Sequence, residues 1–378
     1  YWTTFGHIII LLLIQIGGLG IMTFVTLFAF NLGRNLDLKQ KILMGAALNR
    51  SSFEETGQIV RSILVFTLVA EGAGAIVLFF HWLAPMGAGR AAWYALFHSI
   101  SAFNNAGIDI FGGFQSLQAY YNDPLVIMAT SILFITGGLG FLVIYELINL
   151  KKARGQRWPL SLHSRVVLLA TFIIIAAGSL GIYFMESHYA LVQMSGSEKA
   201  LNAYYLAATR TCGFSTIDLG TTINPTQILM MILMFIGGAP SSTAGGIKVT
   251  TVVILGVTIY SVFRGKRDVE IAERRLPLGD IVRGLTIVLM MGALIILDAF
   301  ILSFYHQDFM KVLFEVVSAA GTVGLSLGLT PELNNVGRIL IAVTMYLGRL
   351  GPATIAYALV YQGQPPQRRF PKGRIMIG

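Results

Sequence analysis

Apolar and polar positions alternate along this chain in long blocks rather than with the short periods of a soluble protein. Residues 5–33 contain no Lys, Arg, Asp or Glu, and comparable uncharged runs recur to the end of the chain. These other runs cover residues 124–145, 166–185, 219–247, 249–263 and 350–367. Because a helix of roughly 20 apolar residues crosses a bilayer, the pattern predicts an all-α, polytopic membrane protein.

A glycine-rich marker recurs four times inside these runs, at intervals of about a hundred residues. The copies are G-G-L-G at 17–20 and 137–140, G-G-A-P at 237–240 and G-R-L-G at 348–351. A second element precedes the last three copies: Asn105-Ala106-Gly107, Thr211-Cys212-Gly213 and Thr322-Val323-Gly324. The last of these resembles half of the T-V-G-Y-G loop whose carbonyls replace the hydration shell of potassium in K⁺ channels. Such joint recurrence indicates repeated units around an ion pore.

Each repeat is expected to hold an outer helix, a re-entrant pore loop and an inner helix, with pseudo-four-fold symmetry around one pore. The segments 91–103, 199–209 and 309–320 are too short to span a bilayer and suit pore helices. The predicted units are an inner helix of the first repeat (1–33), a second repeat (54–150), a third repeat with a broken inner helix (164–263), a fourth repeat (281–363) and a cytoplasmic tail (364–378). The spacing places a first filter strand before Tyr1, so the first repeat is expected to be incomplete. A genuine three-loop protein is the alternative.

The charge distribution predicts the orientation in the membrane. Hydrophobic residues make up 55% of the 378 residues and charged residues 12%, with a net charge of +9. Most Lys and Arg residues lie in four segments that each follow a marker helix: 34–61, 151–165, 264–283 and 368–374. The positive-inside rule places these segments, and therefore the C-terminus, in the cytoplasm. The basic charge thus does not indicate a nucleic-acid partner, and the pore loops are expected on the outer side.

The three pore loops are the candidate selectivity filter. Aligned carbonyls need backbone conformations that glycine adopts at low cost, and a packing or turn role explains any one glycine but not the joint pattern. Potassium is expected at the carbonyls of Asn105, Ala106, Gly107, Thr211, Cys212, Gly213, Thr322, Val323 and Gly324. The side-chain oxygens of Asn105, Thr211 and Thr322 are expected in the innermost layer, where they can also face the ion.

A candidate gate interrupts the apolar run of the third repeat at Gly237–Gly246. This segment is either a flap below the filter or a kinked helix whose Ser and Thr residues satisfy freed carbonyls. Lys248 is expected to face the cavity or an acid, and Arg349 either to face the pore or to pair with Glu315 or Asp298. The predicted gate residues are Gly237, Gly238, Ser241, Ser242, Thr243, Gly245, Gly246, Lys248 and Arg349.

Two groups of residues have other expected roles. Glu71 and Asp298 lie alone in outer helices, where hydrogen bonding between helices is the expected role. The chain has no phosphate-binding loop of the G-x-x-x-x-G-K-S/T type, no H-E-x-x-H and no Cys/His cluster. We therefore expect a protein that is not an enzyme and that holds no covalent cofactor.

The combined motifs resemble the Trk/Ktr/HKT superfamily of potassium transporters, and within it the membrane subunits of bacterial Ktr systems. The motifs are Phe103–Gly107, Thr211–Thr216, Ser242–Lys248 and Gly348–Pro352. The resemblance implies Na⁺-dependent K⁺ uptake across the inner membrane by a homodimer. It also implies a KtrA-like cytoplasmic ring that binds ATP and ADP, and a gating role for the Gly237–Gly246 loop and Arg349. A Trk-type or Na⁺-permeable relative, or an alternating-access solute carrier, are the alternatives.

The basic segments 34–50, 151–165 and 264–283, with the tail 362–378, are the predicted docking surface for the cytoplasmic regulator. The alternative is contact with anionic lipid, which the positive-inside bias also explains. The apolar end Ile375–Gly378 is expected to be buried at a subunit interface.

Overall fold

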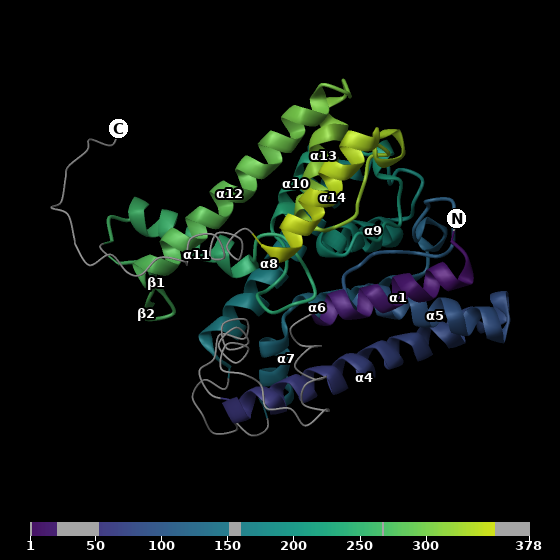
Figure 1. Cartoon of the computed structure of the whole chain (residues 1–378), viewed down its shortest axis with the longest axis horizontal. Coiled ribbons are helices and arrows are strands. Elements are labelled where there is room, and N and C mark those ends of the chain that lie inside the picture. The colour runs from purple at the N-terminus through teal and green to yellow at the C-terminus, as the bar shows by residue number, and fades with distance from the viewer. Residues whose placement is uncertain (1, 21–52, 151–159, 267, 352–378) are drawn as a thin grey trace.

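The computed structural model describes residues 2–20, 53–150, 160–266 and 268–351, and these are almost entirely helical (Figure 1). The predicted tail 364–378 and the basic segments 34–50 and 151–159 lie outside the described residues. Within the described ranges, the strands β1 (Glu270–Ile271) and β2 (Arg274–Arg275) form one antiparallel pair, which lies in the basic segment 264–283. The helical fold agrees with the class predicted from the apolar runs.

In the part of the chain that the structure describes, three long helices have the length and composition to cross a bilayer. They are α4 (Phe53–Met86), α8 (Leu162–Glu186) and α12 (Leu278–Ser303), and the apolar part of α4 begins at Arg61. Large apolar side chains cover their outer faces: Phe80 is 68% exposed, Phe172 71% and Ile296 71%. Side chains of this size at such exposure indicate faces that contact lipid.

A short helix packs against each long helix, as α5 (Ala88–Phe103), α9 (Gly196–Ala208) and α13 (Phe309–Gly321). These helices lie where the sequence predicts pore helices. Ser195 and Glu198 form a capping box at the start of α9, and Asp308 caps α13 by accepting from the amide of Lys311 at 3.2 Å. The polar caps fix where α9 and α13 begin.

The remaining helices complete the bundle around the short helices. They are α1 (Thr4–Leu19), α6 (Pro124–Gly138), α7 (Phe141–Ile148), α10 (Asn224–Phe235), α11 (Val249–Phe263) and α14 (Asn335–Leu350). Single 3₁₀ turns lie at Gln118–Tyr120, Thr209–Thr211, Leu219–Thr221 and Thr330–Glu332. Helix α1 packs along α5, while α10 and α14 pack against α13 (Figure 1).

The inner helix expected in the second repeat (54–150) is not one continuous helix. Helices α6 and α7 are bent by 102° at Leu139-Gly140, where Gly140 has φ 88° and ψ 142°. Helices α1 and α14 end in nearly the same conformation, at Gly20 (φ 82°, ψ 136°) and Gly351 (φ 79°, ψ 133°). Only glycine adopts this backbone at low cost. The last glycine of the marker therefore lies at a helix boundary in these three places, as the C-cap of α1 and α14 and as the N-cap of α7. Residues 21–33 of the expected first inner helix lie outside the described residues.

Candidate functional site

The three predicted pore loops lie next to one another at the C-terminal ends of α5, α9 and α13. A Cβ atom on Gly107 would overlap the carbonyl oxygen of Cys212, and a Cβ atom on Gly213 would overlap that of Val323. Gly324 has open space at the corresponding place. All three glycines have positive φ, at 63°, 98° and 98°. The first two loops thus each press a glycine against a carbonyl of the next loop, and no side chain could replace Gly107 or Gly213 without displacing backbone.

The amide hydrogens of two of these loops point back toward their own short helices. In the first, Ala106 N donates to Ser101 O at 2.9 Å, and in the third, Val323 N donates to Ser318 O at 2.9 Å. In a trans peptide the carbonyl points opposite to the amide hydrogen of the next residue. The carbonyls of Asn105 and Thr322 are therefore turned away from the short helices α5 and α13.

Two serines, each six residues before a loop glycine, add side-chain hydrogen bonds to this arrangement. The Ser101 hydroxyl donates to Ile108 O at 2.8 Å and accepts from Ile108 N at 2.9 Å. The Ser318 hydroxyl accepts from Gly324 N at 3.1 Å. In the middle loop the carbonyl of Thr209 accepts from Cys212 N at 2.8 Å. The serines were missed by the sequence analysis, although their common distance from Gly107 and Gly324 could have identified them.

Two of the three side chains expected in the innermost layer, Asn105 and Thr211, are hydrogen bonded within the protein. Asn105 Nδ2 donates to Phe134 O at 3.0 Å, and Asn105 Oδ1 accepts from the Thr211 hydroxyl at 2.9 Å. The Thr322 hydroxyl lies against Gly245, where a Cβ atom would overlap it. The Asn105 amide and the Thr211 hydroxyl are thus engaged within the protein rather than left free between the loops.

The interruption predicted at Gly237–Gly246 is irregular backbone between α10 and α11, and we call residues 236–248 the central loop. Ile236 and Ile247 pair as a parallel bridge, with Gly237 N donating to Ile247 O at 2.8 Å. Val249 N, at the start of α11, donates to Gly238 O at 3.0 Å. The two ends of the loop are therefore held together, and its middle projects as one compact element.

The central loop satisfies the backbone groups that the bend between α6 and α7 leaves without helical partners. Ala239 N donates to Gly138 O at 2.9 Å and Thr243 N to Gly137 O at 3.2 Å. In return, the carbonyl of Ser241 accepts from Phe141 N at 2.8 Å, at the first residue of α7. Non-helical backbone at membrane depth needs such partners. The loop and the bend thus stabilise each other.

Three cationic side chains bind the central loop by its carbonyl oxygens. Arg210, only 3% exposed, donates to the carbonyls of Ile236 and Gly237, the latter at 3.1 Å. Lys248 Nζ donates to Ala244 O at 2.7 Å. Arg349 donates to Thr243 O and, at 2.5 Å, to Gly17 O in α1. Arg349 therefore lies beside the loop, and Arg210 is a contact that the sequence analysis missed.

The acids proposed as partners for Arg349 bind hydroxyl groups instead. Glu315 accepts from Ser326 at 2.6 Å and also from Thr330, while Asp298 accepts from the hydroxyl of Thr344. Among the residues that the structure describes, no ion pair joins Arg349 to either acid. The ion-pair alternative for Arg349 is thus not supported, and the Asp298 contact joins α12 to α14.

Glu71 joins three helices beside the first pore loop, as expected for an acid alone in an outer helix. Its carboxylate accepts from Asn104 Nδ2 at 2.8 Å and from Gln15 Nε2 at 3.1 Å, and it is 4% exposed. This places α1, α4 and the end of α5 in one hydrogen-bonded group. Such a group fixes the helix from which the loop Asn105–Gly107 begins.

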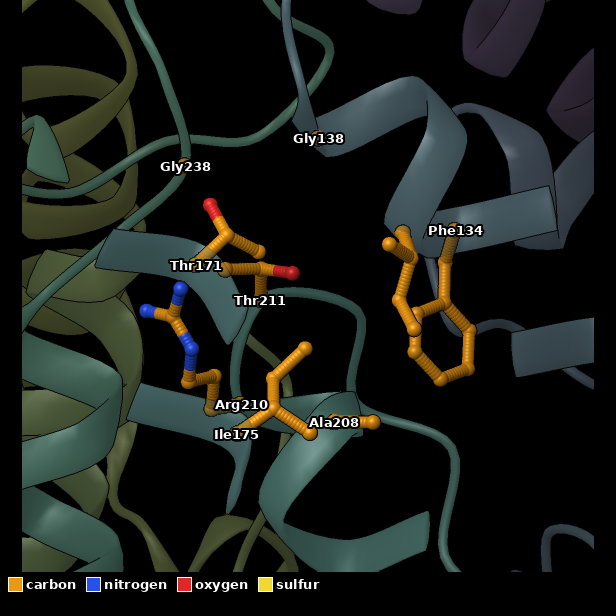
Figure 2. A pocket seen from close by; sticks show the side chains of 9 residues that line it. Phe134, Gly138, Thr171, Ile175, Ala208, Arg210, Thr211 and Gly238 are labelled. Atoms are coloured by element: carbon orange, nitrogen blue, oxygen red, sulfur yellow. The ribbon is translucent and has the colours of Figure 1, made fainter. Parts of the chain in front are cut away.

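A small void lies beside the central loop and the middle pore loop. Figure 2 shows the Arg210 guanidinium and the hydroxyls of Thr171 and Thr211 on one side and Phe134 on the other, with Gly238 at the rim. The void has room for about one water molecule. Within the described ranges, no group of three or more His, Cys, Asp or Glu side chains could hold a metal ion.

Comparison with known proteins places the chain in a family. The family model TrkH, described as a cation transport protein, matches residues 3–367. The chain is 35% identical to Ktr system potassium uptake protein B of Vibrio alginolyticus and 34% identical to that of Bacillus subtilis. Both alignments cover all of this chain and 83% and 84% of the relatives. It is also 32% identical to the potassium/sodium uptake protein NtpJ of Enterococcus hirae, again over the whole chain and 84% of that protein.

A solved structure shows the same fold. The potassium transporter TrkH of Vibrio parahaemolyticus superposes with a TM-score of 0.70 at 16% sequence identity, over 93% of this chain and 70% of that one. The likeness in fold extends over nearly the whole chain, and the family match and the relatives cover the same residues. The chain therefore belongs to the TrkH family of cation transport proteins.

Proposed function

We propose that this protein takes up potassium across the plasma membrane through a channel-like pore whose selectivity filter is built from the three pore loops. One observation carries the proposal: Gly107 is pressed against the carbonyl of Cys212, and Gly213 against that of Val323. A carrier of an organic solute would not need loops whose backbones contact one another at the ends of short helices, whereas a pore lined by carbonyls does. The names of the relatives, which are potassium or potassium/sodium uptake proteins, support the choice of ion.

The filter assignment is tested at Gly324, which has φ 98° and open space beside it. In Gly324→Ser the side chain strains the backbone and enters the proposed ion path, so we expect K⁺ uptake to be lost or K⁺ preference to relax. Gly292→Ala is the matched control, because Gly292 lies in α12 and also has open space around it. Uptake of K⁺ and Na⁺ is measured in proteoliposomes. Wild-type rate and selectivity in Gly324→Ser would refute the assignment.

The central loop is the proposed gate, and Arg349 is its cationic partner. The loop is held by Arg210, Lys248 and Arg349, and its middle, residues 240–243, contributes no side chain to the buried apolar clusters of the described residues. Segments with few buried apolar contacts move aside at modest cost. In the resting state the loop obstructs the path below the filter, and Arg349 adds an electrostatic barrier to cations.

The protein is further proposed to work as a homodimer with a KtrA-like cytoplasmic ring, whose binding of ATP or ADP controls the gate. The support is the similarity to the Ktr uptake proteins and the basic segment 264–283, part of which forms the β1–β2 hairpin. The C-terminus is placed in the cytoplasm by the positive-inside rule. Removal of residues 375–378 should weaken the dimer or the regulator complex, and an intact complex on size exclusion would count against this.

Sodium has two proposed roles that one measurement separates. Na⁺ is either a coupling ion that stimulates K⁺ uptake or a second permeant ion, as the name of the Enterococcus relative suggests. In proteoliposomes, stimulation of K⁺ uptake by external Na⁺ without Na⁺ entry supports the first role, and Na⁺ entry that competes with K⁺ supports the second.

A further inference from the structure

The amide of Asn105 connects the first pore loop to two other parts of the centre. Its Nδ2 donates to the hydroxyl of Thr243 in the central loop at 2.8 Å, and its Oδ1 accepts from Thr211 in the middle pore loop at 2.9 Å. The Thr243 hydroxyl donates in turn to Phe103 O at 3.0 Å, at the last residue of α5. The side chains of all three polar residues are almost fully buried, with exposures of 5%, 0% and 7%.

We propose that the Asn105 side chain is the positioning residue that couples the gate to the filter, so that ion selectivity depends on the position of the central loop. This rests on the proposed function, and it adds that gate and filter are one hydrogen-bonded unit. Asn105 belongs to the filter backbone, and Thr243 moves with the loop.

The coupling follows from the cost of buried polar groups without partners. When the loop moves, the Thr243 hydroxyl leaves both Asn105 Nδ2 and Phe103 O. A donor and an acceptor then lose a partner in surroundings of low dielectric, where such a loss is more costly than in water. The Asn105 amide then shifts toward the acceptors that remain, Phe134 O at 3.0 Å and Phe103 O at 3.4 Å, and its contact with Thr211 changes. Both pore loops are therefore altered when the gate opens.

The residue type at 105 suits this role better than its counterparts in the other two loops. Asn105 has φ 53°, a conformation that asparagine adopts more readily than most residues. An amide carries both a donor and an acceptor on one rigid group. It can therefore hold Thr243 with one atom and Thr211 with the other, so that a displacement at one contact rotates the other. A threonine at this position has one short hydroxyl and could not span both contacts.

The same threonine is also held from the opposite side. The carbonyl of Thr243 accepts from Arg349, and its amide donates to Gly137 O at 3.2 Å. Thr243 is thus the point at which the filter, the bend between α6 and α7, and α14 meet. A change at its hydroxyl alters the filter contact but leaves these backbone contacts in place, which makes the hydroxyl the appropriate group to remove.

The test is a double-mutant cycle on the ratio of K⁺ to Na⁺ uptake in proteoliposomes that contain the full-length protein. Thr243→Val removes the hydroxyl and retains the shape, Thr243→Ser restores a hydroxyl, and Asn105→Ala removes the amide. Thr226→Val is the matched control, because the Thr226 hydroxyl in α10 is equally buried and has no hydrogen-bond partner among the described residues. Size exclusion establishes that each variant is folded, and Thr243→Ala replaces Thr243→Val if the latter is not.

We expect Thr243→Val to lower the K⁺/Na⁺ ratio by about tenfold, equal to ~1.4 kcal/mol, and to raise the K⁺ flux. Thr243→Ser restores most of the ratio, and Thr226→Val does not change it. In the Asn105→Ala background, Thr243→Val should change the ratio by less than about twofold, because the contact is already absent.

Two results would separate failure of this inference from failure of the proposed gate. A raised flux with an unchanged ratio in Thr243→Val, or additive effects on the ratio, would overturn the coupling while the gate assignment stands. An unchanged flux and ratio in Thr243→Val overturns the coupling as well. If, in addition, a deletion in the central loop leaves the flux at the wild-type value, the gate assignment itself is wrong.

Discussion

The pore loops and the central loop are both irregular backbone at the centre of the helices, but they are held in opposite ways. The pore loops are fixed by their own short helices through contacts close in sequence, such as Val323 N to Ser318 O, and by glycines pressed against carbonyls. The central loop is held mainly by side chains and backbone from distant elements, including Arg210 and Arg349.

This difference matches the two tasks proposed for them. A filter must keep its carbonyls in place while ions pass. Local backbone hydrogen bonds and tightly packed glycines restrict movement of the pore loops and so meet this requirement. A gate must have a second position, and contacts made by a few long side chains can be exchanged for water or other partners one at a time. Rigid pore loops would make the pore selective, and a central loop with exchangeable contacts would allow it to be regulated.

The largest effect should come from a side chain forced into the filter. In Gly213→Ala the new Cβ atom overlaps the carbonyl of Val323. The alanine must also adopt φ 98°, which strains the backbone of any residue with a side chain. Strained backbone and overpacking each cost about 1–3 kcal/mol, so we expect loss of K⁺ uptake and a lower unfolding temperature in detergent. Gly256→Ala in α11, where a Cβ atom meets nothing, should behave as wild type. A Gly213→Ala protein with normal selectivity would show that this contact is not part of the filter.

Shortening the central loop should have the next largest effect, with the opposite sign. Deletion of residues 241–244 removes the obstruction and the Arg349 contact with Thr243. We expect K⁺ flux to rise by about tenfold, the equivalent of a barrier lowered by ~1.4 kcal/mol, and to depend less on the cytoplasmic regulator. Flux is measured with and without the regulator. A flux equal to that of the wild type means that the segment is only a kink and that the gate lies elsewhere.

Loss of the Arg210 contact should weaken the anchor of the central loop. In Arg210→Met the carbonyls of Ile236 and Gly237 lose a charged donor while the volume is largely kept. Unsatisfied buried groups cost about 1–3 kcal/mol, so the unfolding temperature should fall and K⁺ flux without the regulator should rise severalfold. Arg264→Met, an exposed arginine at the end of α11, is the control. An unfolding temperature and a K⁺ flux equal to those of the wild type would show that Arg210 does not anchor the central loop.

The smallest effect is expected at Arg349. Arg349→Ala removes a cation and one contact with the loop, so K⁺ flux should rise by less than about tenfold, with no change in which ion is preferred. Arg349→Lys retains the charge and should stay closer to the wild type. If Arg349→Lys and Arg349→Ala raise the K⁺ flux equally, the hydrogen bonds to Thr243 and Gly17 matter more than the charge.

The sequence predicted the parts of the site that depend on local chemistry. The short helices, the pore loops after them and the interruption before α11 were all indicated by apolar length and glycine spacing, and their approximate positions are those of the structure. The bend between α6 and α7 was missed, because Gly137–Gly140 alone does not reveal whether freed backbone groups find partners. Those partners come from Ala239, Ser241 and Thr243, about a hundred residues away.

The roles of single polar residues were harder to predict. Arg210 was missed because an arginine beside a pore loop could equally face solvent, and only the folded chain places it on the carbonyls of Ile236 and Gly237. Asn105 was expected to face an ion, whereas its amide binds Thr211 and Thr243. Which partner a polar side chain selects depends on contacts between segments far apart in sequence, and spacing does not encode them.

The most direct test of the central claim is to locate permeant ions in crystals of the protein grown with Rb⁺ or Tl⁺, by anomalous scattering. We expect peaks on one axis between the carbonyls of Asn105–Gly107, Thr211–Gly213 and Thr322–Gly324, above the central loop. Ion density elsewhere in the protein, with none between these loops, would contradict it.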